Sequence, residues 1–494
     1  MRPSKYSFLF SLLCTLIISN TTIYSQNATG RVLDSDNNPI AFATIQIGEN
    51  FGVITNEEGN YSIDIKRFNP KDSVSISCLG FDKTMILLEN FTSKEYILNE
   101  QINELSEVYL TNKSLSIDSI MIYVKNNLKK NYRFQLNEFN LFSRKTEYIR
   151  GKNVNFEIKK STGFKKKQLK LFNTDFDKLE TSLLHNTSKQ YTEFIGTLKI
   201  LNEEKAKLNV DKALQLLDER NNQSIESLTE KGNDIVLKHL DKEKVYTVKS
   251  GLFKVSDSMS IKNNNDEVKD SINSIENVKN VTFNMIKNYS LIDADSKLDF
   301  VLDNKKYKYE LNGITFLDDE VVYIITFIPK KSSAKYTGTM YVSNETFAVL
   351  RADYKFYKNR VGQKINLKLV LGVKFIENNN AGLVVYKKDL DGYYYPSYMN
   401  EQIDRYFYVD RPVKFIENGN KRNKVAFNFL IEGTFKEKTE LLIISRSEIN
   451  SSSYDSFIEG VINYETPKIY DPSFWKDYHV MEPLKEMKEF KVED

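Results

Sequence analysis

Alternation of apolar and polar side chains between residues 320 and 376 constrains the fold of this 494-residue chain more than any other feature. Within Lys364–Ile376 every odd-numbered position from 365 to 375 is apolar, whereas lysine, asparagine or glycine fills most positions between them. A period of two places alternate side chains on opposite faces of a strand. We therefore predict a strand here, with Leu367, Leu369 and Leu371 facing inward under a helix or under the curl of its own sheet.

The residues just before this strand predict a meander of antiparallel strands. Val321–Pro329 is apolar on both faces, as in a central strand, and its terminal proline cannot donate to a sheet ladder. Two further runs, Tyr336–Val342 and Phe347–Phe356, follow after short polar turns. Three strands joined by short turns indicate that residues 276–450 form a large antiparallel sheet domain.

The N-terminus has the three parts of a secretory signal peptide. Arg2 and Lys5 precede the apolar run Phe8–Ile18, and small or polar residues follow up to Ser25–Gln26. The run is too short to cross a bilayer, which takes about 20 residues. We expect a signal peptide over residues 1–25 and an exported protein, periplasmic, associated with the outer membrane or secreted.

Cysteine usage and charge exclude several classes of protein. Cys14 lies inside the apolar run, too early for a lipoprotein cysteine, so Cys78 is the one cysteine left after processing and no intramolecular disulfide is expected. Cys78 lies in an alternating segment without a neighbouring base, which favours a core position over a reactive thiol. The net charge of +3 gives no indication of nucleic-acid binding.

Residues 28–98 carry about seven short strand patterns separated by turn residues, which predicts a small β-sandwich. This segment resembles the carboxypeptidase regulatory-like domain. The matching residues are Gly30-x-Val32-x-Asp34, Asn38-Pro39-Ile40, Ala43-Thr44-Ile45, Gly52-x-x-Thr55-Asn56-x-x-Gly59-x-Tyr61 and Ser77-x-x-Gly80-Phe81. Asn56 replaces the aspartate that the family often has. The resemblance implies a transthyretin-like sandwich over residues 26–110, an envelope setting and a docking or stabilising role, without catalysis.

Residues 111–275 predict a mixed α/β region. A helix near 116–130 has Ile117, Ile120 and Val124 on one face and Ser116 as its cap. A second helix is expected near 203–221, because Ala206, Val210, Ala213, Leu214 and Leu217 form one stripe at helical spacing. Residues 451–494 complete the chain as a C-terminal tail. The expected fold class is mainly β with some helix (α+β): a seven-strand sandwich, then a large antiparallel, curled sheet with packed helices.

The strand rhythm of the meander is similar to the half-barrel sheets of lipoprotein-sorting factors. The residues that carry this likeness are Tyr323-x-Ile325-x-Phe327-x-Pro329, Tyr336-x-Gly338-x-Met340-Tyr341-Val342 and Phe347-Ala348-Val349. Such sheets curl around helices and can hold acyl chains. The resemblance implies a lipid-handling alternative, and no ligand residue transfers with it.

No catalytic, cofactor-binding or metal-binding constellation emerges from the sequence. The three histidines are His185, His239 and His479, and His479-Val-Met-Glu482 spells His-x-x-Glu. A catalytic zinc needs three protein ligands, and no histidine follows this pair. We therefore expect no enzyme, no cofactor and no metal. An unrecognised hydrolase stays open as an alternative, because a sequence does not give the separation of two carboxyl groups.

Two surface features remain as candidates for partner contact. The aromatic run Tyr393, Tyr394, Tyr395 and Tyr398 could form a ligand or partner surface, although packing of a strand and turn explains it as well. A lysine cluster could meet anionic lipid headgroups, or it could be a solvated edge. Its members are Lys159, Lys160, Lys165, Lys166, Lys167 and Lys170.

These features together predict a non-enzymatic, exported envelope protein with a binding or assembly role at the outer membrane. The first alternative is a carrier of a lipid or another hydrophobic ligand on a half-barrel sheet. An envelope protein, a glycan or a lipid stays open as partner, a peripheral membrane contact is allowed, nucleic acid is excluded, and the oligomeric state is open.

Overall fold

The structure is a computed structural model in which three sheets and several helices are described. The predicted signal peptide (1–25) lies outside the described residues, and so do residues 102–110, for which the sequence predicts one more strand. The described residues are 27–48, 51–66, 68–101, 115–162, 166–219, 222, 227, 231, 235, 244–250, 253–260, 274–293, 295–317, 320–420, 422–476, 478 and 480–492. Strands dominate and helices are fewer, as the sequence predicts.

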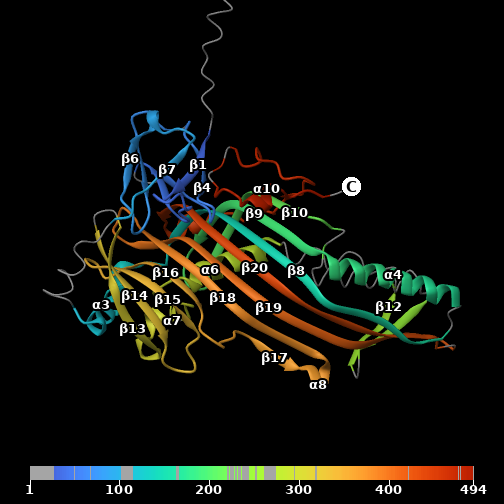
Figure 1. Cartoon of the computed structure of the whole chain (residues 1–494). Helices are drawn as coiled ribbons and strands as arrows, with labels where there is room; N and C mark the ends of the chain where they lie inside the picture. Colours follow the sequence, from blue (N-terminus) through green and yellow to red (C-terminus); the bar gives the residue numbers. More distant parts are fainter. Residues whose placement is uncertain are drawn as a thin grey trace, which may run out of the picture.

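Seven short strands at the N-terminus form the predicted β-sandwich (Figure 1). They are β1 (Asn27–Leu33), β2 (Thr44–Ile47), β3 (Phe51–Ile54), β4 (Asn60–Asp64), β5 (Ser73–Ser77), β6 (Thr84–Leu87) and β7 (Glu95–Ile97), with a 3-10 turn, η1 (Leu88–Asn90), after β6. One sheet has the order β4-β1-β7 and the other β3-β2-β5-β6. Val32, Ile45 and Ile76 are fully buried in the core between the two sheets.

The rest of the chain builds a sheet of 14 described strands that is not closed. Its main order is β13-β14-β15-β16-β18-β19-β20-β8-β9-β10-β21, and β11, β12 and β17 pair at its sides. Four long neighbours, β18, β19, β20 and β8, run diagonally through the molecule (Figure 1). The strands are β8 (Asn137–Ser161), β9 (Thr187–Ile200), β10 (Ala206–Leu217), β11 (Val245–Ser250), β12 (Phe253–Ser260), β13 (Tyr307–Leu317), β14 (Glu320–Pro329), β15 (Tyr336–Ser343), β16 (Val349–Phe356), β17 (Lys364–Leu367), β18 (Val373–Lys388), β19 (Tyr394–Glu417), β20 (Lys424–Glu448) and β21 (Tyr464–Glu465).

Helices pack on this sheet at two places. The described helices are α3 (Ile117–Asn131), α4 (Lys166–His185), α6 (Ile275–Asn288), α7 (Asp299–Leu302), α8 (Lys368–Leu371), α9 (Ser451–Asp455) and α10 (Lys485–Lys488), with η2 (Asn304–Lys306). Residues of α3, α6 and α7 share one core with the strands from β13 to β20. Helix α4 packs separately on the far ends of β8 and β20. None of the described helices is long and apolar enough to cross a membrane.

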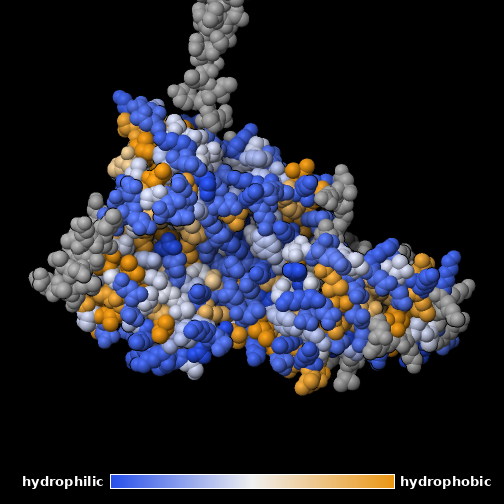
Figure 2. Space-filling view, in the orientation of Figure 1, coloured by the Kyte–Doolittle hydropathy of each residue, from blue (hydrophilic) through white to orange (hydrophobic). Residues whose placement is uncertain are grey.

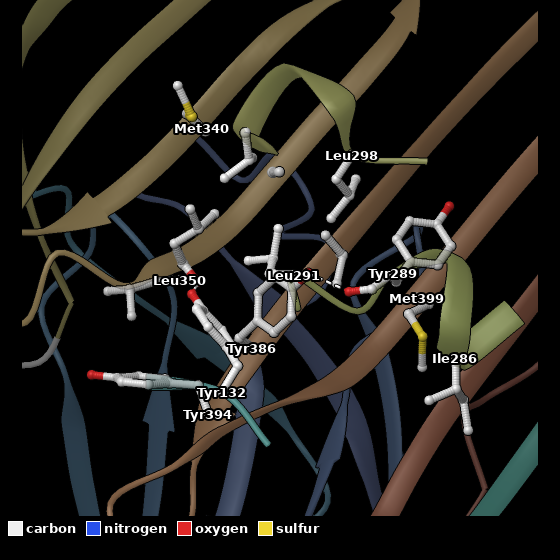
Figure 3. Close-up of a cluster of buried hydrophobic side chains, with 14 of the residues drawn as sticks. Tyr132, Ile286, Tyr289, Leu291, Leu298, Met340, Leu350, Tyr386, Tyr394 and Met399 are labelled. Atoms are coloured by element: carbon white, nitrogen blue, oxygen red, sulfur yellow. Dashed lines mark hydrogen bonds between the residues drawn. The ribbon is translucent and has the colours of Figure 1, made fainter. Parts of the chain in front are cut away.

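The largest core lies between the helices and the sheet and is filled with side chains (Figure 3). Several of them are tyrosines whose buried hydroxyls are hydrogen-bonded. Tyr289 is fully buried; its hydroxyl lies 2.7 Å from that of Tyr354 and donates to the carbonyl of Asn400. Tyr386 donates to the carbonyl of Tyr289 at 2.6 Å, and Tyr132 donates to that of Val349. A buried hydroxyl without a partner would be costly, so these bonds allow a tightly packed interior.

Two local predictions are confirmed in detail. The meander is present as β14, β15 and β16, with β14 ending at Pro329 and a turn at 344–346. The first helix begins as expected, because the Ser116 side chain accepts a hydrogen bond from the Ser119 backbone amide. Ile120 and Val124 on its apolar face are fully buried.

The helix predicted near 203–221 is wrong, because β10 occupies this stretch. Its residues pair with β9 from Ala206↔Ile200 to Leu217↔Gln190, with a bulge between Val210 and Lys212. The sequence of β10 satisfies both a helical and a strand period, and the bulge changes which side chains face the core. Tertiary pairing with a long neighbouring strand therefore overrides local helix propensity.

The strand predicted over Lys364–Ile376 is interrupted, and its inward face is wrong. Strand β17 pairs with the start of β18, and the one-turn helix α8 joins them. Leu369 is fully exposed, Leu367 is 43% exposed and Leu371 is half-buried. Gly372 has a φ of 65°, in the left-handed region that glycine favours, and this residue turns the chain back. No described helix or strand covers this hairpin.

The predicted boundary between residues 111–275 and 276–450 does not separate two sheets. Strands β8, β9 and β10 of the first segment belong to the same sheet as the strands from β13 to β20. The C-terminal residues 451–492 return to it, because β21 pairs in parallel with β10.

Candidate functional site

An open basin of about 800 Å³ lies where β8, β9 and β20 meet the end of α4. Its walls combine aliphatic, aromatic and cationic side chains. The lining residues are Tyr148, Arg150, Gly151, Lys152, Leu184, Thr187, Thr434 and Lys436. We refer to this depression as the cationic basin.

Strand register brings the basin residues together from three segments. Arg150 pairs with Thr434 on β20 and with Thr187 on β9, and Tyr148 pairs with Lys436. The pairing between β20 and β8 shifts between Glu432 and Gly433, which re-aims the side chains next to Lys152. A side chain at Gly151 would come within 2.6 Å of the Leu183 carbonyl, so glycine lets α4 end against the sheet.

The cations of the basin are exposed and weakly paired. Arg150, Lys152 and Lys436 are all exposed. Lys436 lies 4.0 Å from Asp404, at the limit of an ion pair. Among the described residues no carboxylate lies within ion-pair distance of Arg150 or Lys152. Their charge is available to an incoming anion.

One rim of the basin is held by the C-terminal tail. The Tyr148 and Tyr191 hydroxyls both donate to Glu486 of α10 at 2.6 Å, and Lys189 lies 3.4 Å from the same carboxylate. Burial and then the hydrogen bond to Glu486 raise the pKa of both tyrosines, which stay protonated donors. Burial acts to raise the pKa of Glu486, but the two hydroxyls and Lys189 outweigh it and hold that pKa below its usual value.

This cluster predicts an acid-sensitive tail. A carboxyl whose folded pKa is depressed stabilises the fold above its unfolded pKa, about 4.3 for glutamate, and loses that contribution as the pH falls through the lower folded value. Acidification should loosen α10, and Glu486→Gln should reduce this pH dependence. Hydrogen exchange of residues 484–490 at neutral and acidic pH measures it. Equal acid responses of the variant and the wild type would contradict the assignment.

A buried ion pair between β8 and β9, the strands that also contribute to the basin, locks the tail to the sheet. Arg144 on β8 and Glu193 on β9 are 3% and 1% exposed, and they lie 2.6 Å apart. The Trp475 indole donates to the second oxygen of Glu193 at 2.6 Å, and Arg144 also donates to the Met481 carbonyl. A charge this deeply buried persists only when it is paired and hydrogen-bonded, and here both conditions hold.

The sandwich is docked on the same junction. Phe42 stacks on Tyr398 of β19 with ring centroids 5.1 Å apart. The Asn56 side chain donates to the Glu482 and Pro483 carbonyls of the tail. Lys438 of β20 contacts Glu57 at 2.9 Å and Glu440 at 3.0 Å. Asn56, where the family often has aspartate, here supplies the amide donors that bind the tail.

The four tyrosines predicted from the sequence do not share one exposed face. Tyr394 and Tyr398 are 5% and 0% exposed and lie in two different cores. Tyr398 donates to Glu440 at 2.9 Å. Tyr395 is half-buried, and Tyr393 is half-buried under Arg133, whose guanidinium lies 4.2 Å from the ring centroid. All four take part in packing.

The other predicted polar residues lie apart from the basin. The described residues contain no group of three histidine, cysteine or acidic side chains able to hold a metal; His239 and His479 lie outside them. His185 is exposed at the end of α4 and contacts the Thr181 carbonyl. Cys78 is buried and unpaired, and burial raises its pKa, as expected of a core position.

The predicted lysine cluster is described only in part. Lys167 and Lys170 are exposed on α4. Lys165 and the side chains of Lys159, Lys160 and Lys166 lie outside the described residues. Its contact with lipid headgroups stays a prediction.

Comparison with known proteins identifies the sandwich. Residues 28–110 match the model of the CarboxypepD_reg-like domain family. No curated protein matches the chain. A solved structure described as lipid–protein interactions in lipovitellin aligns with 69% of this chain and 28% of its own, at 8% identity and a TM-score of 0.22. A likeness this low carries no argument. The chain spans little more than a quarter of that protein.

Proposed function

We propose that this chain is a non-enzymatic, exported protein of the cell envelope that binds an anionic ligand in the cationic basin. The regulatory-like sandwich and the tail act as a fixed support for the basin. In this proposal the protein has a binding or assembly role at the outer membrane. The observation that carries the proposal is the set of three exposed cations around one depression, whose lining residue Tyr148 is bonded to the tail.

The chemistry of the basin favours a ligand with two or more phosphate or carboxylate groups. Arg150 presents a planar fork that matches such groups, and Lys152 and Lys436 add point charges. Leu184 and the Tyr148 ring supply apolar contact for the uncharged part of the ligand. Phosphorylated or acidic glycans and lipid headgroups share this chemistry.

The alternative of a lipid carrier on a half-barrel sheet receives less support. Its cargo would need an apolar space inside the curl of the sheet. Helices α3, α6 and α7 fill that side with buried residues such as Ile120, Ile286 and Phe300. A hydrolase receives less support still, because the buried carboxylates Glu193 and Glu440 are each held by neighbouring side chains.

Isothermal titration calorimetry with polyphosphate and with polygalacturonate measures binding and tests the proposal. The double substitution Arg150→Glu with Lys436→Glu should weaken the affinity at least about tenfold, since it reverses two of the three charges. Wild-type binding should also weaken as salt is added. The control carries the same charge change on β13 and in the turn after β14, Lys308→Glu with Lys330→Glu, both exposed.

Equal losses in both double variants would indicate nonspecific charge attraction and would contradict the basin. Absence of binding by the wild type would do the same. Location is tested separately: membrane fractionation with mass spectrometry of the mature N-terminus should find a protein that begins near residue 26 in the envelope fraction. A cytoplasmic protein that retains residue 2 would overturn the envelope assignment.

A further inference from the structure

The hairpin formed by β17, α8 and the start of β18 carries a group of four exposed apolar side chains. Leu369 is 101% exposed and Val370 is 80% exposed; Ile365 and Leu367 are 48% and 43% exposed. In Figure 2 a hydrophobic group protrudes at the lower edge of the molecule, where Figure 1 places α8. We call these four residues the apolar tip.

The apolar tip is held in a defined conformation. Strand β17 pairs with β18 from Lys364↔Ile376 to Leu367↔Val373. At the turn, the Gly372 amide donates to the Lys368 carbonyl at 3.1 Å, and the Gly372 carbonyl accepts from the Asp410 amide of β19 at 2.8 Å. The apolar side chains are therefore presented outward by a hydrogen-bonded turn rather than by a loose loop.

Lysines flank the apolar tip. The hairpin from residue 364 to residue 376 carries Lys364, Lys368 and Lys374 and no acidic residue, while Asp410 of β19 lies beside its turn. Lys368 lies over the Tyr408 ring at 3.9 Å and Lys374 over the Tyr406 ring at 5.3 Å, so both ammonium groups are held beside the hairpin. Leucine and valine at a tip with lysines behind them match the layers of a membrane surface, where acyl chains lie below anionic headgroups.

We infer that the apolar tip inserts into a bilayer containing anionic lipid. Its lysines contact the headgroups while Leu369 and Val370 enter the boundary with the acyl chains, at a depth of about 5–10 Å. Four apolar residues cover too little area for a stable protein interface, which buries about 800 Å² on each partner. The sandwich lies at the opposite side of the molecule from α8 (Figure 1), so this docking points it away from the membrane.

Vesicle sedimentation of the full mature chain tests the inference independently of the basin. The wild type should bind to vesicles of phosphatidylcholine with phosphatidylglycerol. It should bind much less to vesicles of phosphatidylcholine alone. Leu369→Asn with Val370→Asn should lower the partition coefficient at least about tenfold, and so should Lys364→Glu with Lys368→Glu. The matched control is Ile458→Asn with Val461→Asn, two strongly exposed apolar residues elsewhere in the chain, at 82% and 80%. It should bind as the wild type does.

Insertion has its own readout. Leu369→Cys labelled with an environment-sensitive dye should shift its emission to the blue on addition of the anionic vesicles, and Cys78 is buried away from the dye. A dye that stays in water, or a control pair that loses as much binding as the tip pair, would overturn the inference. The anion-binding variants of the basin should keep vesicle binding, so failure of one proposal leaves the other testable.

Discussion

Replacing Arg144 by alanine is expected to lower the free energy of unfolding by about 3–5 kcal/mol, the usual loss when one partner of a buried ion pair is removed. Glu193, which is 1% exposed in the wild type, would lose its buried cation and keep the Trp475 indole as a donor. The Met481 carbonyl would lose its bond as well. Trp475 is the one tryptophan of the chain, so its fluorescence during denaturant unfolding measures the release of the tail directly.

A partly exposed arginine in a weaker pair supplies the control for this experiment. Arg31 lies 3.8 Å from Glu95, with side chains 40% and 60% exposed, and it also donates to the Glu58 carbonyl. Arg31→Ala should change stability by no more than about 1 kcal/mol, because water screens exposed pairs. Equal effects of the two substitutions would show that the Arg144–Glu193 pair does not lock the junction.

Local patterns predict the sandwich, the meander and the first helix because each depends on neighbouring residues. The turn at Asn56–Gly59 needs a glycine with positive φ, and Gly59 has a φ of 75°. Ser116 caps its helix from within the first turn. Such signals act over a few residues, so the sequence is enough to identify them.

The junction and the basin depend on contacts that no local pattern encodes. Glu193 and Trp475 are 282 residues apart in the sequence, and Arg144 and Glu193 are 49 apart. Arg150, Thr187 and Thr434 meet only through the register of β8, β9 and β20. Single arginine and lysine residues in separate strands form no sequence motif, so the sequence does not predict that they share a site.

The hairpin at Lys364–Ile376 shows a different limit. Its alternation indicates strand structure, but a pattern does not say whether another layer covers the apolar face. Pairing between β16 and β18 covers only residues 381–385 of β18. Nearer the start of β18, at residues 373–376, the partner strand is β17. No described helix or strand packs over the exposed apolar side chains of β17. The same apolar residues that predict a core become a surface feature.

Replacing Phe300 by alanine is expected to give the other large loss, about 3–5 kcal/mol of unfolding free energy, as for a large aromatic side chain removed from a packed core. Phe300 on α7 is fully buried and stacks on Phe327 of β14, with ring centroids 4.1 Å apart. Its removal would leave a cavity beneath the helices that fill the sheet.

Leu369→Ala is the matched comparison, and it should change stability by no more than about 0.5 kcal/mol, because a fully exposed side chain makes few contacts to lose. Denaturant unfolding followed by circular dichroism separates the two results. A large loss from Leu369→Ala would mean that the hairpin packs against something in solution and would remove the basis for membrane insertion. A small loss from Phe300→Ala would mean that the space under the sheet collapses easily or opens, and the carrier alternative would then regain support.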